Sequence, residues 1–349
     1  MNFLKKIFLV LIFLFPISNS FGAMVTLVDN LNVSLDTTSD KEITGIQFNS
    51  DGTKAFISFY RDSSGGTDYS WIDEYNLSVP YDVSTGTYAG DSERCDVNHG
   101  LQASSGHNPF TFQFSADGTK FFMANRRHTA AGSGYTNMDR NFVFRFDLTT
   151  PYDISTCSYA QRTSNLFLDT NLDGSNAGPN PNDEGHKNTR LQGVTISSDG
   201  KKMFTLTNND RVREYNLSTP FDLTTFSLVT SAGINLTGTT NNPMGITFSA
   251  NGKRLFVASH NGHTVTQISL TKAFDTSSFT VDGSVAFNGS ALGSINQLRP
   301  VAFNKNGLKL YLGEDFSGGN TVGRAWEYNL GCPFNIISGK CPSITENSD

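Results

Sequence analysis

The stretch Phe114-Ser-Ala-Asp-Gly-Thr-Lys-Phe-Phe122 places an Asp-Gly pair between two apolar ends. Asp or Asn followed by Gly tolerates the positive φ angles that tight hairpin turns need. The residues on both sides of the turn are Phe, a type that favours strands. The stretch therefore predicts a β-hairpin.

Four further phrases align with this hairpin on its turn. With the quoted hairpin extended back to Phe110, the set is GIQFNSDGTKAFISF from Gly45, FTFQFSADGTKFFMA from Phe110, GVTISSDGKKMFTL from Gly193, GITFSANGKRLFVA from Gly245 and PVAFNKNGLKLYLG from Pro300. Successive turns are 66, 82, 52 and 55 residues apart. A phrase that recurs at such intervals indicates a repeat architecture, in which each unit packs on its neighbours.

A second phrase follows each hairpin. Its copies are DEYNLSVPYDVST from Asp73, FRFDLTTPYDIST from Phe144, REYNLSTPFDLTT from Arg213, TQISLTKAFDTSS from Thr266 and WEYNLGCPFNIIS from Trp326. We interpret it as a third strand and a fixed loop, in which Pro pre-sets φ and Asp caps the next turn. Short fourth strands follow in four units as GTYAG, CSYAQ, FSLVT and FTVDG. Four strands per unit are typical of β-propeller blades.

The fifth unit lacks a fourth strand of its own, and MVTLVDNLNVSL from Met24 resembles the missing piece. We expect residues 24 to 30 to form the outer strand of the last blade, because closure removes exposed strand edges. The alternative is a loose N-terminal arm. The predicted fold is all-β, a propeller of five blades with four antiparallel strands each, closed by the N-terminal strand. The predicted propeller domain covers residues 23–338, with a tail at 339–349.

The hairpins resemble the SPDGKxLYV-like repeat of the exported YVTN-type and lactonase-like β-propellers. The resemblance covers the five hairpins and the strand after each, and it implies a propeller. It is weak for function, because this repeat occurs in both enzymes and binding proteins. The chain departs from that group in its YNLSxPYD loop and in having five visible repeats where seven are usual.

The first 22 residues predict a secretory signal peptide. Lys5 and Lys6 precede an apolar run from Ile7 to Phe15, and small residues follow, with cleavage expected after Ser20 or Gly22. The alternative is a buried N-terminal helix or an uncleaved anchor. The apolar run is too short to span a membrane as a helix. We therefore expect a secreted or periplasmic protein.

Charge narrows the choice of partners. Removal of the two lysines takes the formal net charge from −6 to −8, with no block of like charge. An acidic protein is a poor partner for nucleic acid or an anionic membrane.

Four cysteines in an exported chain are compatible with two disulfides. Cys332 and Cys341 lie close together in a tail without repeat character, so we pair them. Cys95 and Cys157 are then paired by elimination, with buried free thiols as the alternative.

The two ends of the predicted ring differ in sequence. The end with the hairpin turns and the Pro-Tyr-Asp loops, called here the turn face, is uniform, and we interpret it as structural. The other end, called here the loop face, is irregular and holds all six histidines, His99 included. The neutral explanation is that the longest loops lie there; the alternative is a ligand or metal site at the channel mouth. The candidate ligand-binding residues are His107, Arg126, Arg127, His128, His186, Asp210, His260, His263, Glu314 and Asp315.

The segment Asp169–Gly174, DTNLDG, has the spacing of an oxygen-ligand calcium loop. The candidate ligands are Asp169, Asn171, Asp173 and Ser175. The match is incomplete, because Asn180 stands where a bidentate Glu is expected. Calcium is therefore the one cofactor that the sequence suggests, against the alternative of a solvated acidic loop.

Two hypotheses of function follow. The first is an exported binding module that presents its loop face to a protein, a glycan or a small ligand. The alternative is a hydrolase of the lactonase or glycosidase kind with a metal or carboxylates at the channel mouth. The chain has no G-x-S-x-G elbow, no H-E-x-x-H, no phosphate loop and no Cys-x-x-Cys pair, so no motif identifies a catalytic residue.

Overall fold

A computed structural model describes residues 24–33, 41–61, 69–97, 107–127, 141–164, 166, 190–293, 295, 297–314, 323–337 and 341. Within these residues there is no α-helix, and the chain forms strands joined by turns and five 3-10 turns. The 3-10 turns are η1 (Val83–Thr85), η2 (Asp91–Glu93), η3 (Ile154–Thr156), η4 (Leu223–Thr225) and η5 (Ser290–Leu292).

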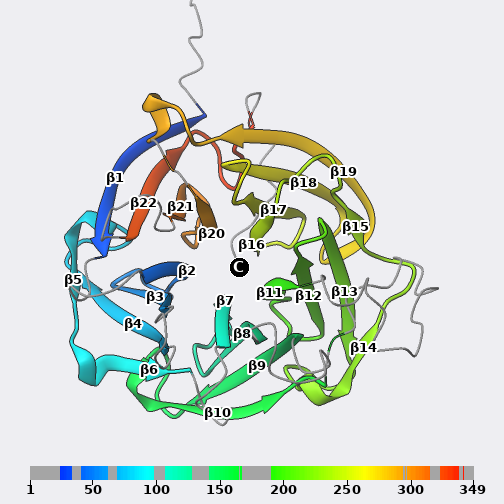
Figure 1. The fold of residues 1–349 in the computed structure, drawn as a ribbon, viewed down its shortest axis with the longest axis horizontal. Helices are drawn as coiled ribbons and strands as arrows, with labels where there is room; N and C mark the ends of the chain where they lie inside the picture. The colour runs from blue at the N-terminus through cyan, green and yellow to red at the C-terminus, as the bar shows by residue number, and fades with distance from the viewer. Residues whose placement is uncertain are drawn as a thin grey trace, which may run out of the picture.

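Five antiparallel sheets form the blades of a ring, as Figure 1 shows. Blade 1 contains β2 (Lys41–Phe48), β3 (Lys54–Arg61), β4 (Tyr69–Leu77), β5 (Gly86–Tyr88) and β6 (Arg94–Asp96). Blade 2 contains β7 (His107–Phe114), β8 (Lys120–Arg127), β9 (Asn141–Leu148) and β10 (Cys157–Arg162). Blade 3 contains β11 (Leu191–Ile196), β12 (Lys202–Thr207), β13 (Arg211–Leu217), β14 (Phe226–Leu228) and β15 (Ile234–Asn235). The predicted five-blade propeller is confirmed.

The other two blades complete the ring. Blade 4 contains β16 (Pro243–Phe248), β17 (Arg254–Ser259), β18 (Thr264–Lys272) and β19 (Asp275–Ala286). Blade 5 contains β20 (Leu298–Phe303), β21 (Lys309–Glu314), β22 (Gly323–Leu330) and β1 (Val25–Val33). Strand β1 pairs with β22 from Val25↔Leu330 to Val33↔Gly323, so the N-terminal strand closes the last blade as expected. In blades 1 and 3 the outer strand is broken in two, a detail that the sequence did not predict.

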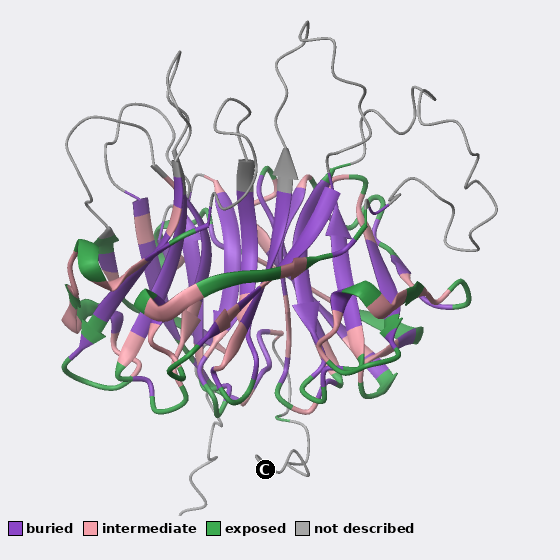
Figure 2. Ribbon diagram, turned by 90° about the horizontal axis from the view of Figure 1, so that it is seen from below, coloured by how far each residue is buried: buried purple, intermediate pink, exposed green. Residues whose placement is uncertain are grey.

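The first strand of every blade lies nearest the central axis (Figure 1). The buried hydrophobic residues form five clusters, each of which joins neighbouring blades. Burial of this apolar surface between blades is the main favourable contribution to folding. Figure 2 shows the consequence, with buried strands across the middle of the ring and exposed turns at its edges.

The two repeated phrases meet in space. In each blade, the aromatic residue of the Pro-Tyr-Asp loop has a left-handed backbone and covers the glycine of the hairpin turn. The five pairs are Gly52–Tyr81, Gly118–Tyr152, Gly200–Phe221, Gly252–Phe274 and Gly307–Phe334. The glycine carbonyl accepts a hydrogen bond from the aromatic residue's N–H, at 2.8 Å for Tyr81 and 2.9 Å for Tyr152. The glycine is therefore required both for its positive φ and because a side chain there would overlap the ring.

Polar side chains join the blades at the same end. In four of the five junctions, a cation of one blade donates to the carbonyl oxygen of the aromatic loop residue in the next blade. The donors are Lys309 to Tyr81, Arg145 to Phe221, Lys202 to Phe274 and Arg254 to Phe334. Buried Glu327 and Glu214 also pair with Lys309 and Lys202. The glutamates that recur in the EYNL phrases thus stabilise the junctions between blades.

Two disulfides complete the structure. Cys95 of β6 bonds to Cys157 of β10, with Cα atoms 5.9 Å apart, and so joins blades 1 and 2. Cys332 bonds to Cys341, with Cα atoms 5.4 Å apart. Both predicted pairings are confirmed. Disulfides fit an oxidising location such as the cell exterior or the periplasm.

Candidate functional site

The loop face lies at the end where the first strand of each blade begins and the second strand ends. His107 is the first residue of β7 and pairs with Arg127, and Arg126 pairs with Asn108. The side chains of His107, Arg126 and Arg127 lie outside the described part of the structure. So do His128, His186, Asp315 and the predicted calcium ligands Asp169, Asn171, Asp173 and Ser175.

The other four predicted residues have described side chains, and all lie at the loop face. Asp210 is in the turn between β12 and β13, His260 and His263 are between β17 and β18, and Glu314 ends β21. They belong to blades 3, 4 and 5, so the fold distributes them around one rim. The prediction that they share a face agrees with the strand directions, but their role in binding stays a prediction.

Asp210 is held by the loop that follows blade 3. It has a left-handed backbone with φ 59, and its carboxylate accepts a hydrogen bond from the Thr240 hydroxyl at 2.6 Å. Partial burial raises the pKa of Asp210 above its ordinary value, although the Thr240 bond and Arg211 oppose the shift. An aspartate of this kind holds its proton to higher pH than a solvated one.

The two histidines of blade 4 differ in their contacts. The ring of His260 is buried, and its nitrogens lie 2.8 Å from Asn261 Oδ1 and 3.1 Å from Gln297 Oε1, which links blade 4 to the segment before blade 5. His263 has φ 50, and its buried Nδ1 has no hydrogen-bond partner among the described residues. The contacts of His260 thus stabilise the rim, whereas one ring nitrogen of His263 has no hydrogen-bond partner within the described ranges.

Blade 5 contributes charge to the same rim. Glu314 is buried and accepts a hydrogen bond from the Trp326 indole at 3.1 Å. Nearby in the ring, Arg299 of β20 forms an ion pair with Glu42 of β2 at 2.8 Å, across the junction of blades 5 and 1. Both charges of this pair come from innermost strands, so the pair lies beside the central axis.

Sequence reasoning missed two buried amides at this end of the ring. Asn125, near the end of β8, and Gln192, at the start of β11, are each 2% exposed, and neither side-chain oxygen has a hydrogen-bond partner within the described part of the chain. Gln192 lies in a β-bulge, where the register of β11 against β12 shifts. Bulges redirect side chains and are common beside functional sites. Gln192 stands directly before the repeat glycine Gly193, and that variable position was the available signal.

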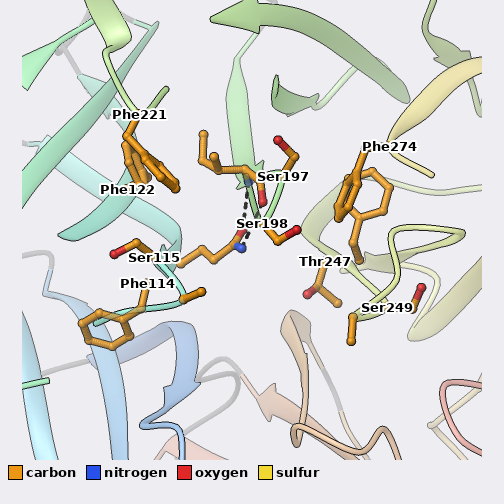
Figure 3. Close-up of a pocket in the computed structure, with 14 residues that line it drawn as sticks. Phe114, Ser115, Phe122, Ser197, Ser198, Phe221, Thr247, Ser249 and Phe274 are labelled. Atoms are coloured by element: carbon orange, nitrogen blue, oxygen red, sulfur yellow. Dashed lines mark hydrogen bonds between the residues drawn. The ribbon is translucent and has the colours of Figure 1, made fainter. Parts of the chain in front are cut away.

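One pocket lies instead at the turn face, between the ends of blades 2, 3 and 4 (Figure 3). Its volume is about 170 Å³, and its walls are mostly aromatic rings and serine residues. The sequence predicts this face to be structural, and none of the lining residues is among the predicted site residues.

Metal binding has no support from side-chain geometry in the described ranges, where no three His, Cys, Asp or Glu side chains gather. Among the residues that the structure describes, no helix is long and apolar enough to cross a membrane.

Comparisons with known proteins report the fold alone. No protein-family model and no curated protein matches the chain. Among solved structures, the chain is similar to the periplasmic gluconolactonase of Pseudomonas aeruginosa, at 12% identity and a TM-score of 0.45, with 82% of this chain and 74% of that one covered. It is also similar to a putative 6-phosphogluconolactonase of Bacteroides fragilis, at 12% identity and a TM-score of 0.43, with 78% of this chain covered.

A third similar structure is Chaetomium thermophilum Sqt1 bound to the N-terminus of ribosomal protein L10, at 12% identity and a TM-score of 0.35, with 81% of this chain and 72% of that one covered. The chain spans 64% of the length of the Bacteroides fragilis protein. The similar structures thus include both lactonases and a protein-binding propeller. They do not separate the two hypotheses of function.

Proposed function

We propose that the chain is an exported β-propeller that binds a protein, a glycan or a small ligand through its loop face. The residues proposed to take part are His107, Arg126, Arg127, His128, His186, Asp210, His260, His263, Glu314 and Asp315. The ring supplies a rigid support, and the residues at its irregular end supply recognition.

One observation carries the proposal. Among the residues that the structure describes, the buried side-chain polar atoms without a hydrogen-bond partner include four at the loop face: Asn125 Oδ1, Gln192 Oε1, Thr207 Oγ1 and His263 Nδ1. Such an atom costs roughly 1–3 kcal/mol of stability, so each needs an explanation. A bound ligand that donates hydrogen bonds to these atoms would repay that cost.

A binding role is favoured over catalysis because the buried carboxylates of the strands have structural partners. Glu214 bonds to Lys202 and to the backbone N–H of Thr276, and Glu327 bonds to Lys309 and to the N–H of Val83. A glycosidase needs two carboxylates that flank the substrate. These two are committed to bonds between blades.

The hydrolase remains the second candidate because of Asp210. Its raised pKa is the property expected of a proton donor at the mouth of a site. A lactonase or glycosidase would use this carboxyl together with a metal or a second carboxylate at the channel.

Binding is tested by a matched pair of glutamine variants. Gln192→Leu removes an amide whose oxygen has no partner, and Gln113→Leu removes one that bonds to Ile196 and Thr195 at the turn face. We expect Gln192→Leu to keep or raise the melting temperature and to weaken binding, and Gln113→Leu to lower the melting temperature and leave binding intact.

The binding readout is saturation-transfer NMR against a panel of oligosaccharides and D-glucono-1,5-lactone. Lactone opening is followed in parallel by proton release. Turnover of the lactone above the uncatalysed rate, lost in Asp210→Asn, would overturn the binding module in favour of the hydrolase.

We further propose export through a signal peptide at residues 1–22, with the propeller domain at 23–338 and a tail at 339–349, and a secreted or periplasmic location. The disulfides support this proposal. N-terminal sequencing of exported material tests it, and a mature chain that begins at Met1 would contradict it.

Calcium binding at Asp169, Asn171, Asp173 and Ser175 is likewise a proposal. A ligand that binds only the folded state raises the melting temperature by mass action. We expect calcium to do so for the unaltered protein and not for Asp169→Asn with Asp173→Asn. No response of the unaltered protein to calcium or to a chelator would end the idea.

A further inference from the structure

The pocket at the turn face arises from one departure from the repeat. In four blades, the last residue of the innermost strand is a phenylalanine that completes a cluster of three rings. Each cluster contains the inner phenylalanine, a ring from the second strand of the preceding blade and the ring of the Pro-Tyr-Asp loop. These clusters are Tyr311–Phe48–Tyr81, Phe56–Phe114–Tyr152, Phe204–Phe248–Phe274 and Phe256–Phe303–Phe334.

Blade 3 has Ile196 at this position. Its two flanking rings, Phe122 and Phe221, stack on each other with centroids 5.8 Å apart. In the other blades, the inner phenyl ring lies between 4.4 and 5.6 Å from each of its two partners. The third ring of the cluster is therefore missing in blade 3 alone.

The pocket lies where that ring would be expected. Its lining includes Ile196 of blade 3 and Phe248 of blade 4. Figure 3 shows Phe122 and Phe221 on one side of it and Phe274 on the other. The side chains of Phe221 and Phe248 are only partly buried, so both can contact a guest from solvent. Offset or edge-to-face contact with such rings favours an aromatic guest over an aliphatic one of equal size.

The polar groups of the pocket determine which polar groups a bound molecule can carry. Ser115, Ser197 and Ser249 donate to side chains of their own turns, Asp117, Asp199 and Asn251, at 2.6–2.8 Å. Ser198 and Thr247 differ, because within the described part of the chain neither hydroxyl bonds to another residue. None of the 14 lining residues carries a charge. The pocket thus offers aromatic walls, two unused hydroxyls and no ion.

We propose that this pocket binds a small, neutral, hydroxylated aromatic molecule, a phenol in the simplest case. The ring takes the position that a phenylalanine fills in the other blades, and the hydroxyl bonds to the half-buried Thr247 in preference to the exposed Ser198. The site lies at the opposite end of the propeller from the proposed recognition face, so it does not depend on the proposed function.

The probe is phenol, titrated into the purified full mature chain with saturation-transfer NMR as readout. Cyclohexanol serves as the non-aromatic control of similar size, and benzoate as the charged control. For a ligand of this size we expect a dissociation constant on the order of 1 mM. Phenol should bind roughly threefold to tenfold more tightly than either control.

Two variants locate the site. Ile196→Phe supplies the missing ring, so it should abolish phenol binding and leave the melting temperature unchanged or higher. Thr247→Val keeps the shape and removes a hydroxyl, so it should weaken phenol several-fold and leave benzene binding unchanged. Asp210→Asn, at the other face, is the matched control and should leave phenol binding unchanged.

Three results would overturn the proposal. The first is no saturation transfer to phenol at about 10 mM, well above the expected dissociation constant. The second is equal affinity for phenol and cyclohexanol. The third is phenol binding that survives both Ile196→Phe and Thr247→Val; should Ile196→Phe fail to fold, the Thr247→Val result decides alone.

Discussion

The two ends of this propeller differ in how far their contacts repeat from blade to blade. At the turn face, one glycine, one aromatic ring and one backbone hydrogen bond recur in all five blades. At the loop face, Asp210, His260 and Glu314 occupy rim positions in three blades, each with different partners. Stability therefore depends on the repeated end, whereas the residues at the other end can vary from blade to blade.

The largest expected effect is a difference in stability between two glycine substitutions, one in a turn covered by an aromatic ring and one in an open turn. Gly118 and Gly238 both have positive φ, but a Cβ at Gly118 would overlap the Tyr152 ring, whereas a Cβ at Gly238 meets nothing within 4 Å. Gly238→Ala should cost about 1 kcal/mol, the strain of a left-handed residue. Gly118→Ala should cost about 3 kcal/mol or more, because the ring must also move. Chemical denaturation measures both, and equal losses would contradict the role of the aromatic ring.

A smaller loss is expected where cations join the blades. Lys202 pairs with buried Glu214 and donates to the Phe274 carbonyl at 2.8 Å, whereas its neighbour Lys201 is exposed. Lys202→Met leaves the buried carboxylate without its cation and should cost about 2 kcal/mol, less than a fully buried pair because Lys202 is partly solvated. Lys201→Met should stay within about 0.5 kcal/mol. Similar melting curves for the two variants would show that the junction does not depend on this contact.

We expect the loss of stability at acid pH to depend on an aspartate of the turn face. Partial burial tends to raise the pKa of Asp117, but hydrogen bonds from Ser115 and Thr119 outweigh it and hold the pKa below the ordinary value of 3.8. A depressed carboxyl pKa stabilises the fold above the unfolded value, and that contribution is lost as the pH falls through the folded pKa.

We therefore expect Asp117→Asn to be less stable than the unaltered protein at pH 5 and to show a smaller loss between pH 4 and pH 2. Both differences should stay below about 1 kcal/mol, because Asp117 is exposed and solvent screens its interactions. Denaturation at a series of pH values measures this difference. Parallel curves over the whole range would refute it.

The smallest effect is expected at the loop face. The pKa of Asp210 is raised by burial, so its ionisation reduces stability as the pH rises above the unfolded value. Asp210→Asn keeps an acceptor for the Thr240 hydroxyl and removes the charge. It should change stability at pH 7 by less than about 0.5 kcal/mol, in the stabilising direction. A loss above about 1 kcal/mol would show that this end also supports the ring.

The repeat made most of the fold predictable. Five Asp-Gly or Asn-Gly turns fix five hairpins, and a fifth unit without its own outer strand requires another strand to close it, which Val25–Val33 supplies. Both disulfides followed from cysteine position alone. The broken outer strands of blades 1 and 3 did not follow, because short strands at an edge depend on packing more than on pattern.

The site was less predictable for a physical reason. Strand direction placed Asp210, His260, His263 and Glu314 at one end, since antiparallel strands alternate their ends. The sequence does not show which polar side chains are buried. It therefore did not indicate Gln192 and Asn125, whose side-chain oxygens have no hydrogen-bond partner among the described residues.

The architecture could be predicted from the repeats, because turn chemistry and apolar pattern are local properties that every repeat contains in full. Tertiary structure alone decided which glycine lies under which ring, which carboxylate pairs across a junction and where a pocket stays open. Those contacts join residues that are distant in the chain, as Val83 and Glu327 are. Ile196 illustrates the limit: its letter stands plainly in the aligned phrases, but only the packing of three blades shows that a ring is missing beside it.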